Sequence, residues 1–250
     1  MKTLLFSFLI VSILLVSCNN GASEKPGFYR DTIIVHDTVL AEGTFIYNIP
    51  CKVVNIHPEL PGKAMLVFWL HGGVRDQKRH NFFAWEHHMT WVKADDYIIE
   101  YLQQNRKKAV FLNPICYKAD IPNCIRWIDC ASDIKHMIDD YVRNGIADKN
   151  RVYLLGSSDG GSGTWDLVEQ HGEWFAAAMP LSCSRARKTS VPVYWHSTKS
   201  EGDQTAQVEA LNAQGCHIVY EYHPHVTHGA DETACDKMHL DKLFSHVKGE

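Results

Sequence analysis

The chain has 250 residues, of which 45% are hydrophobic, and a formal net charge of −4. This length and composition fit one globular domain with a sizeable core. The charged residues are scattered and form no basic stripe, which argues against nucleic acid as a partner.

The first residues have the pattern of an export signal. Lys2 precedes an apolar run from Leu4 to Val16, and such a run is too short to span a membrane comfortably. The run ends in Leu15-Val16-Ser17-Cys18, which resembles the lipobox of bacterial lipoproteins. By that resemblance Cys18 is lipidated and anchors an exported protein to a membrane, in the periplasm or at the cell surface. The alternative is an ordinary signal peptide that happens to contain a cysteine.

The domain boundaries follow from this segment, because a signal peptide and a polar tether do not belong to the fold. No second apolar run is long enough to span a membrane, so the lipid is the only predicted membrane anchor. We predict a signal peptide at 1–17, a lipidated cysteine and flexible tether at 18–30, and one domain at 31–250.

Seven cysteines remain after Cys18, so at least one stays unpaired or pairs between chains. Export to an oxidising compartment permits disulfides. Cys124 and Cys130 are close in sequence, as are Cys216 and Cys235, but the sequence leaves the pairing open.

Apolar runs alternate with segments of helical periodicity along most of the chain. The run at 64–70 is apolar throughout, as expected of a strand buried on both faces. Alternation of strands and helices predicts an α/β fold with a mostly parallel, doubly wound sheet, in which ligands bind beyond the C-terminal ends of the strands. Strands are predicted at 32–35, 44–49, 64–70, 109–112, 151–155, 175–179, 191–195 and 218–222, and helices at 134–142, 161–171, 206–213 and 231–247.

The stretch Gly156-Ser157-Ser158-Asp159-Gly160 matches the G-x-S-x-G pattern between a predicted strand and a predicted helix. In that context the pattern indicates a nucleophile elbow, a sharp turn that exposes a serine hydroxyl above a sheet. Small neighbours are needed because bulky side chains one turn away would crowd the turn. Ser158 is therefore the candidate nucleophile. The alternative is a Gly/Ser-rich turn without chemistry.

A serine nucleophile needs a base and an acid that orients the base, and in this fold they follow it in the order acid, then histidine. His228 is the candidate base because it lies in the loop after the last predicted strand, with His225 as its nearest competitor. Asp203 is the first choice for the acid and Glu201 the second, since both follow the strand at 191–195. Protonation of the histidine would stop it from accepting the serine proton, so activity should fall at acidic pH.

The histidine-rich loop also allows a metal hypothesis. His223, His225 and His228 form an H-x-H-x-x-H pattern that could collect zinc. Histidine-rich loops without metal are common, and the nucleophile requires a base, so we predict no metal and no cofactor.

The oxyanion hole requires two backbone N–H groups aimed at the substrate oxygen. One is expected from Asp159, the residue after the nucleophile. The other is expected from His71-Gly72-Gly73, directly after the strand at 64–70, where Gly72 and Gly73 let the backbone approach the substrate.

Four stretches resemble the α/β-hydrolases, and more narrowly the secreted esterases that include feruloyl esterases, acetyl-xylan esterases and polyhydroxybutyrate-depolymerase-like proteins. The likeness extends over about residues 40 to 248. It implies a single-domain α/β-hydrolase fold without a large lid, and ester hydrolysis through an acyl-enzyme on Ser158, acting on acyl groups of glycans. The stretches are Val67 to Gly73, Asp148 to Gly161, Phe175 to Ala178, and Val191 to His196.

Three departures from that family bear on the site. His196-Ser197 stands where the family has His-Gly, and Ser200 occupies the usual acid spacing. The last motif lacks the family's Gly-x-Gly before His228, and a carboxylate at Asp159 would oppose a forming oxyanion. Two alternative functions therefore stay open: a catalytically silent protein of this fold that binds glycan, and a serine peptidase.

Overall fold

The computed structural model of the chain describes residues 33–34, 51–73, 94–114, 116 and 126–249. The predicted signal peptide at 1–17, Cys18, the tether at 18–30, the predicted strand at 44–49 and Cys124 lie outside the described residues. Within the described part, no helix has the length and apolar character needed to cross a membrane.

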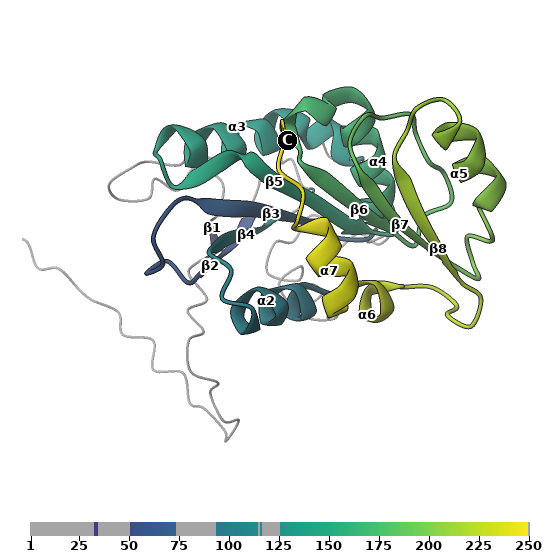
Figure 1. Cartoon of the computed structure of the whole chain (residues 1–250), viewed down its shortest axis with the longest axis horizontal. Coiled ribbons are helices and arrows are strands. Elements are labelled where there is room, and N and C mark those ends of the chain that lie inside the picture. Colours follow the sequence, from purple (N-terminus) through teal and green to yellow (C-terminus); the bar gives the residue numbers. More distant parts are fainter. Residues whose placement is uncertain (1–32, 35–50, 74–93, 115, 117–125, 250) are drawn as a thin grey trace, which may run out of the picture.

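A mostly parallel sheet forms the centre of the molecule, which confirms the predicted α/β class (Figure 1). Among the described residues it has eight strands in the order β1-β2-β4-β3-β5-β6-β7-β8. The strands from β4 to β8 in that order run parallel, and β1 and β2 add an antiparallel edge. Their bounds are β1 Ile33–Ile34, β2 Cys51–Ile56, β3 Ala64–Leu70, β4 Ala109–Pro114, β5 Ala147–Ser157, β6 Ala177–Leu181, β7 Val193–Thr198 and β8 Ile218–His223.

Helices cover both faces of the sheet, as a doubly wound fold requires. In Figure 1, α3, α4 and α5 lie above the sheet, and α2, α6 and α7 lie below it. Their bounds are α2 Ala94–Gln104, α3 Ala131–Arg143, α4 Asp159–His171, α5 Thr205–Asn212, α6 Asp231–Ala234 and α7 Lys237–Leu243, with short 3-10 turns η2 at Trp127–Cys130 and η3 at Gly172–Trp174.

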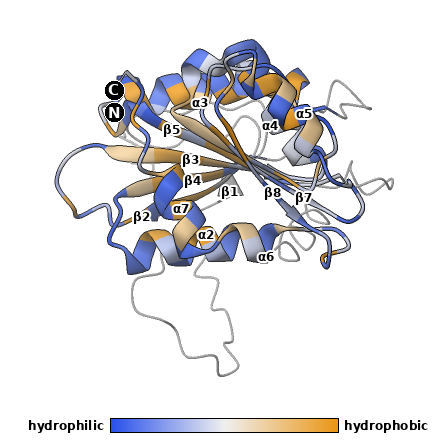
Figure 2. Cartoon of the chain, turned by 45° about the vertical axis from the view of Figure 1, so that its right-hand side comes forward, coloured by the Kyte–Doolittle hydropathy of each residue, from blue (hydrophilic) through white to orange (hydrophobic). Residues whose placement is uncertain are grey.

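The core consists of two layers separated by the sheet. Successive side chains of a strand point to opposite faces, so an entirely apolar strand contributes to both layers. In β3, Leu66 and Phe68 pack toward α3 and α4, whereas Met65 and Val67 pack toward α2 and α7. Figure 2 shows the hydrophobic colouring of the strands between the helical layers.

Three elements differ from the sequence-based prediction. Strand β2, which begins directly after Pro50, was not predicted. Helix α2 was not predicted either, although its buried residues Ile98, Ile99 and Leu102 have helical spacing. The prediction of a single closing helix at 231–247 was wrong, because the segment forms two helices, α6 and α7. Asp236 between them has an extended backbone, and its side chain accepts a hydrogen bond from the backbone N–H of His239, which caps the start of α7.

No disulfide joins two of the described cysteines. Cys216 belongs to the core layer under α5, whereas Cys235 belongs to the layer under α7 on the opposite face of the sheet. These two residues are close in sequence but are separated by the sheet, so they cannot pair within one chain.

Candidate active site

The turn between β5 and α4 has the backbone geometry of a nucleophile elbow. Ser158 has φ of +58° and ψ of −115°, a left-handed value that is rare for a residue with a side chain. Its N–H donates to Leu181 O at 2.9 Å, which ties the turn to the end of β6. Strain of this kind persists where the surrounding structure holds it, and it gathers at functional sites.

Close backbone packing explains both glycines of the motif. A Cβ at Gly156 would lie 2.5 Å from Gly160 O, and a Cβ at Gly160 would lie 1.9 Å from Leu70 O. Both distances are impossible contacts with backbone atoms, so neither position accepts a side chain without moving the turn or strand β3.

A buried carboxylate holds the candidate base. His228 Nδ1 lies 2.7 Å from Glu201 Oε1. The Glu201 side chain is 8% exposed and His228 is 48% exposed, so the acid is enclosed while the imidazole reaches the surface. With Nδ1–H donating to the carboxylate, Nε2 is left to take a proton from a serine.

Hydrogen bonds keep Glu201 ionised. Burial raises the pKa of this carboxyl, but the hydroxyl and backbone N–H of Thr198 and the His228 ring donate to it, and together they lower the pKa below its ordinary value of 4.5. An ionised carboxylate at this position can stabilise a positive charge on the His228 ring.

The turn after β7 selects Glu201 over Asp203. The N–H groups of Glu201 and Gly202 both donate to Thr198 O, which folds the chain back so that the Glu201 side chain faces Thr198 and His228. Asp203 is exposed, and its carboxylate accepts from the backbone N–H and hydroxyl of Thr205 at 2.9 and 2.7 Å. The geometry therefore favours Glu201, the second choice for the acid, in place of Asp203.

Ser182, which the sequence analysis did not single out, links the two halves of the site. Its hydroxyl accepts from the N–H groups of Gly229 and Ala230 at 3.1 and 2.7 Å, directly after His228. Ser182 follows Leu181, whose carbonyl binds Ser158 N–H. The His228 loop is thus attached to the strand end beside the elbow.

Asp231 provides a second contact between these halves. Burial raises the pKa of its carboxyl, while a hydrogen bond with Ser157 and the charge of His228 act in the opposite direction. One side chain therefore faces both the elbow and the candidate base. Among the described residues, Ser158 Oγ makes no hydrogen bond to His228, and such bonds are often long or poorly aligned before substrate binds.

The expected oxyanion loop lies against the elbow. A Cβ at Gly72 would lie 3.3 Å from Ser158 Cβ, so the Gly72 backbone is next to the nucleophile. A Cβ at Gly73 would overlap Asp159 Oδ2 at 1.8 Å, which places the Asp159 carboxylate directly on the Gly73 backbone. The three residues expected at the hole are therefore together, and a carboxylate faces the loop.

Comparisons with solved structures decide the fold. A thermostable esterase matches with a TM-score of 0.58 and 18% identity, over 89% of this chain and 64% of its own length. The feruloyl esterase module from Clostridium thermocellum, a mutant complexed with sinapinate, matches with a TM-score of 0.58 and 13% identity, over 81% of this chain and 85% of that one. A putative dienelactone hydrolase from Klebsiella pneumoniae matches with a TM-score of 0.56 and 14% identity, over 86% of this chain and 95% of that one.

The chain has the α/β-hydrolase fold. The first of these structures is longer, so this chain spans just under two thirds of it. No protein-family model matches the sequence, and no curated protein matches it.

His71 fixes the expected oxyanion loop of this α/β-hydrolase fold. Its buried ring lies between Gly72 O, 2.7 Å from Nδ1, and the backbone N–H of Cys116, 3.1 Å from Nε2. Trp127 donates its indole N–H to His71 O and packs edge-on against the ring. Contacts of the His71 and Trp127 side chains therefore hold the loop in place.

Several tryptophans of the chain belong to the core. Trp127 and Trp165 are buried, 2% and 0% exposed, and Trp165 packs against Trp195. Trp85 and Trp91 lie outside the described residues.

The histidines of the H-x-H-x-x-H pattern have different surroundings. His223 is buried at the end of β8, where it contacts His196, whereas His228 contacts Glu201 and His225 is exposed. The pattern therefore does not describe one ligand set in the hydrolase fold.

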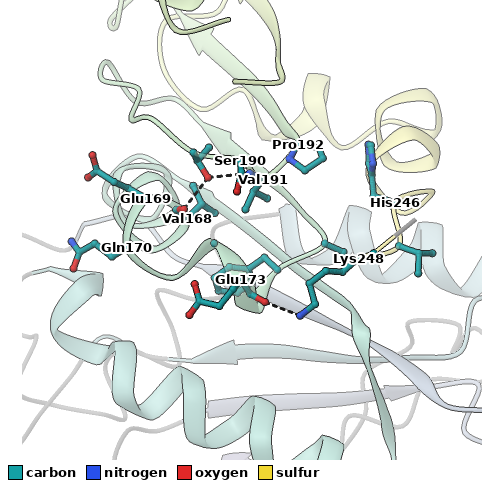
Figure 3. A pocket seen from close by; sticks show the side chains of 15 residues that line it. Val168, Glu169, Gln170, Glu173, Ser190, Val191, Pro192, His246 and Lys248 are labelled. Carbon is teal, nitrogen blue, oxygen red and sulfur yellow. Dashed lines mark hydrogen bonds between the residues drawn. The ribbon is translucent and has the colours of Figure 1, made fainter. Parts of the chain in front are cut away.

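The groove of Figure 3 lies at the N-terminal ends of β6 and β7, whereas the elbow follows the C-terminal end of β5. Phe175 and Val191, which line it, precede β6 and β7, and Lys248 Nζ donates to Glu173 O at 2.7 Å across it. Ligands in open α/β folds bind at the C-terminal ends of the strands, where Ser158 lies. This groove is not the candidate active site.

Proposed function

We propose that this protein is a serine hydrolase that cleaves carboxylic esters. The contact between His228 and buried Glu201, on a loop tied to the strained Ser158 turn, is the observation that carries the proposal. Solved esterases that share the fold support the proposal.

The proposed mechanism uses only residues of this chain. Ser158 Oγ attacks the ester carbonyl while His228 Nε2 takes the hydroxyl proton, and Glu201 stabilises the imidazolium. Backbone N–H groups at Asp159 and in the Gly72-Gly73 loop stabilise the oxyanion. The alcohol leaves with the proton from His228, and water, activated by His228, then releases the acid from the acyl-enzyme and restores Ser158.

We propose acyl groups on glycans as the substrate class, of the feruloyl or acetyl type. The connection 182–192 between β6 and β7 contains no helix that would form a lid, which suits an ester on a bulky scaffold. The feruloyl esterase module that shares the fold was complexed with sinapinate, an aromatic acid, which supports the same class. The lipobox-like Cys18 supports an exported lipoprotein that meets such polymers in the periplasm or at the cell surface.

The Asp159 carboxylate on Gly73 favours one alternative, a catalytically silent glycan-binding protein of this fold, because a negative charge there opposes an oxyanion. Hydrolysis of p-nitrophenyl acetate, methyl ferulate and acetylated xylan by the purified protein separates the two. We expect turnover that Ser158→Ala abolishes. Equal background rates for both proteins on all three esters, with retained xylan binding, would establish the silent protein instead.

A further inference from the structure

A second polar cluster lies on the face of the sheet covered by α7, and its strand β7 is two strands away from β5, which leads into the Ser158 turn. His196 is in β7, Glu221 and His223 are in β8, and His239 is in α7. His196 pairs with Glu221 in the β7–β8 register, and Tyr194, two residues earlier on the same face, belongs to the core layer with Leu240 of α7. Three elements, β7, β8 and α7, therefore bring imidazole and carboxylate groups to one place.

The donor atoms are within reach of one cation. His196, Glu221 and His239 each offer one ligand atom, and these atoms lie within 4.8 Å of one another. Glu221 Oε2 is 3.0 Å from His239 Nε2 and 4.0 Å from His196 Nδ1. Tetrahedral zinc with bonds of about 2.0–2.1 Å separates its ligand atoms by about 3.3 Å. The distance of 3.0 Å from Glu221 to His239 is shorter than this value, and the distance of 4.0 Å from Glu221 to His196 is longer.

The surroundings of the histidines match those of metal ligands. The side chain of His239 is 9% exposed, and its Nδ1 lies 2.9 Å from Asp236 Oδ1 without hydrogen-bond alignment. Metal-binding histidines commonly direct their second ring nitrogen at a carboxylate in this way. His196 is 3% exposed, and its Nδ1 lies 3.0 Å from His223 Nε2 with the two rings 7° from parallel, which fixes the orientation of the His196 ring.

We propose that His196, Glu221 and His239 bind a divalent cation of the zinc type. Two imidazoles and one carboxylate are a donor set that suits zinc. The Glu221 side chain is 49% exposed, so a fourth position faces solvent and takes water. A cation here would replace two direct contacts, between His239 Nε2 and Glu221 Oε2 and between His196 Nδ1 and His223 Nε2, with metal–ligand bonds.

The cation would brace the candidate active site without entering it. It would join β7, β8 and α7, and His196 O accepts the N–H of Ser182, whose hydroxyl holds the loop after His228. The expected effect is on stability and on the placement of that loop. The proposal does not rest on the proposed esterase activity.

Zinc titration of the full chain, stripped of metal with a chelator, tests the proposal. We expect one equivalent of Zn²⁺ per chain, the visible absorption of tetrahedral Co²⁺ on cobalt substitution, and a rise in Tm of about 5–10 °C at zinc about 100-fold above Kd. Glu221→Gln and His239→Gln should each weaken zinc binding by about 100-fold, since changes to partners beyond the ligands already cost about 10–100-fold.

Two matched variants make the result specific. His225→Ala removes an exposed histidine of the H-x-H-x-x-H pattern and should bind zinc like the wild type, as should Ser158→Ala, whose hydrolytic activity is expected to be lost. Glu221→Gln is isosteric at a half-exposed position, so circular dichroism can verify its fold. The proposal would be overturned if the wild type bound no stoichiometric zinc. It would also be overturned if zinc binding were lost in His225→Ala and kept in His239→Gln.

Discussion

Replacement of Glu201 by glutamine tests the assignment of the acid. The substitution keeps the size of the side chain but removes the charge 2.7 Å from His228 Nδ1. Two unit charges about 4 Å apart interact by about 4 kcal/mol at an effective dielectric constant of about 20. His228 is 48% exposed, so water screens part of this energy.

We therefore expect Glu201→Gln to raise the barrier by about 2–4 kcal/mol, which corresponds to a loss of about 30-fold to 1,000-fold in kcat. Asp203→Asn is the matched control, because Asp203 is exposed and bonded to Thr205, and it should leave kcat within about twofold of the wild type. Steady-state hydrolysis of p-nitrophenyl acetate measures both variants. A large loss in Asp203→Asn together with an active Glu201→Gln would refute the assignment.

Three further predictions concern the surroundings of this pair. Asp159→Asn removes the negative charge beside Gly73 and should leave kcat unchanged or raise it; a loss of about 100-fold or more would show that the carboxylate has a positive role. Ser182→Ala leaves the N–H groups of Gly229 and Ala230 without their acceptor and should lower the free energy of unfolding in urea titrations by about 1–3 kcal/mol. The control Ser162→Ala, at an exposed position, should change it by less than about 0.5 kcal/mol. Because the pKa of Glu201 is lowered on folding, its ionised form contributes stability that is present above pH 4.5 and is lost as the pH falls through the folded pKa. The Tm of the wild type should therefore exceed that of Glu201→Gln by less as the pH falls through this window. A difference in Tm that stays constant there would contradict the lowered pKa.

The sequence predicts elements whose signal is local. Strand β3 matches its prediction at both ends because Ala64 to Leu70 is apolar throughout, and a short run of this kind fits a strand buried on both faces. The turn at Ser158 was likewise predictable, since Gly156 and Gly160 are required by backbone contacts that any G-x-S-x-G elbow makes.

The sequence could not distinguish the two acids, because both lie in one polar loop after β7. The choice depends on the turn at Thr198, whose carbonyl accepts two N–H groups, and on the meeting of this loop with Thr227 through Ser200. The cluster of His196, Glu221 and His239 was also hidden, since its members come from three elements and share no spacing. Ser182 had no sequence signal except its place after an apolar run.

The central claim is that Ser158 is a nucleophile activated by His228. Phosphonylation of the purified protein by a fluorophosphonate, mapped by mass spectrometry, tests it without knowledge of the natural substrate, because only an activated serine reacts quickly. The account predicts a single adduct on Ser158 that forms in the wild type and is strongly slowed in His228→Ala. An unlabelled Ser158, or labelling equally fast without His228, would contradict it.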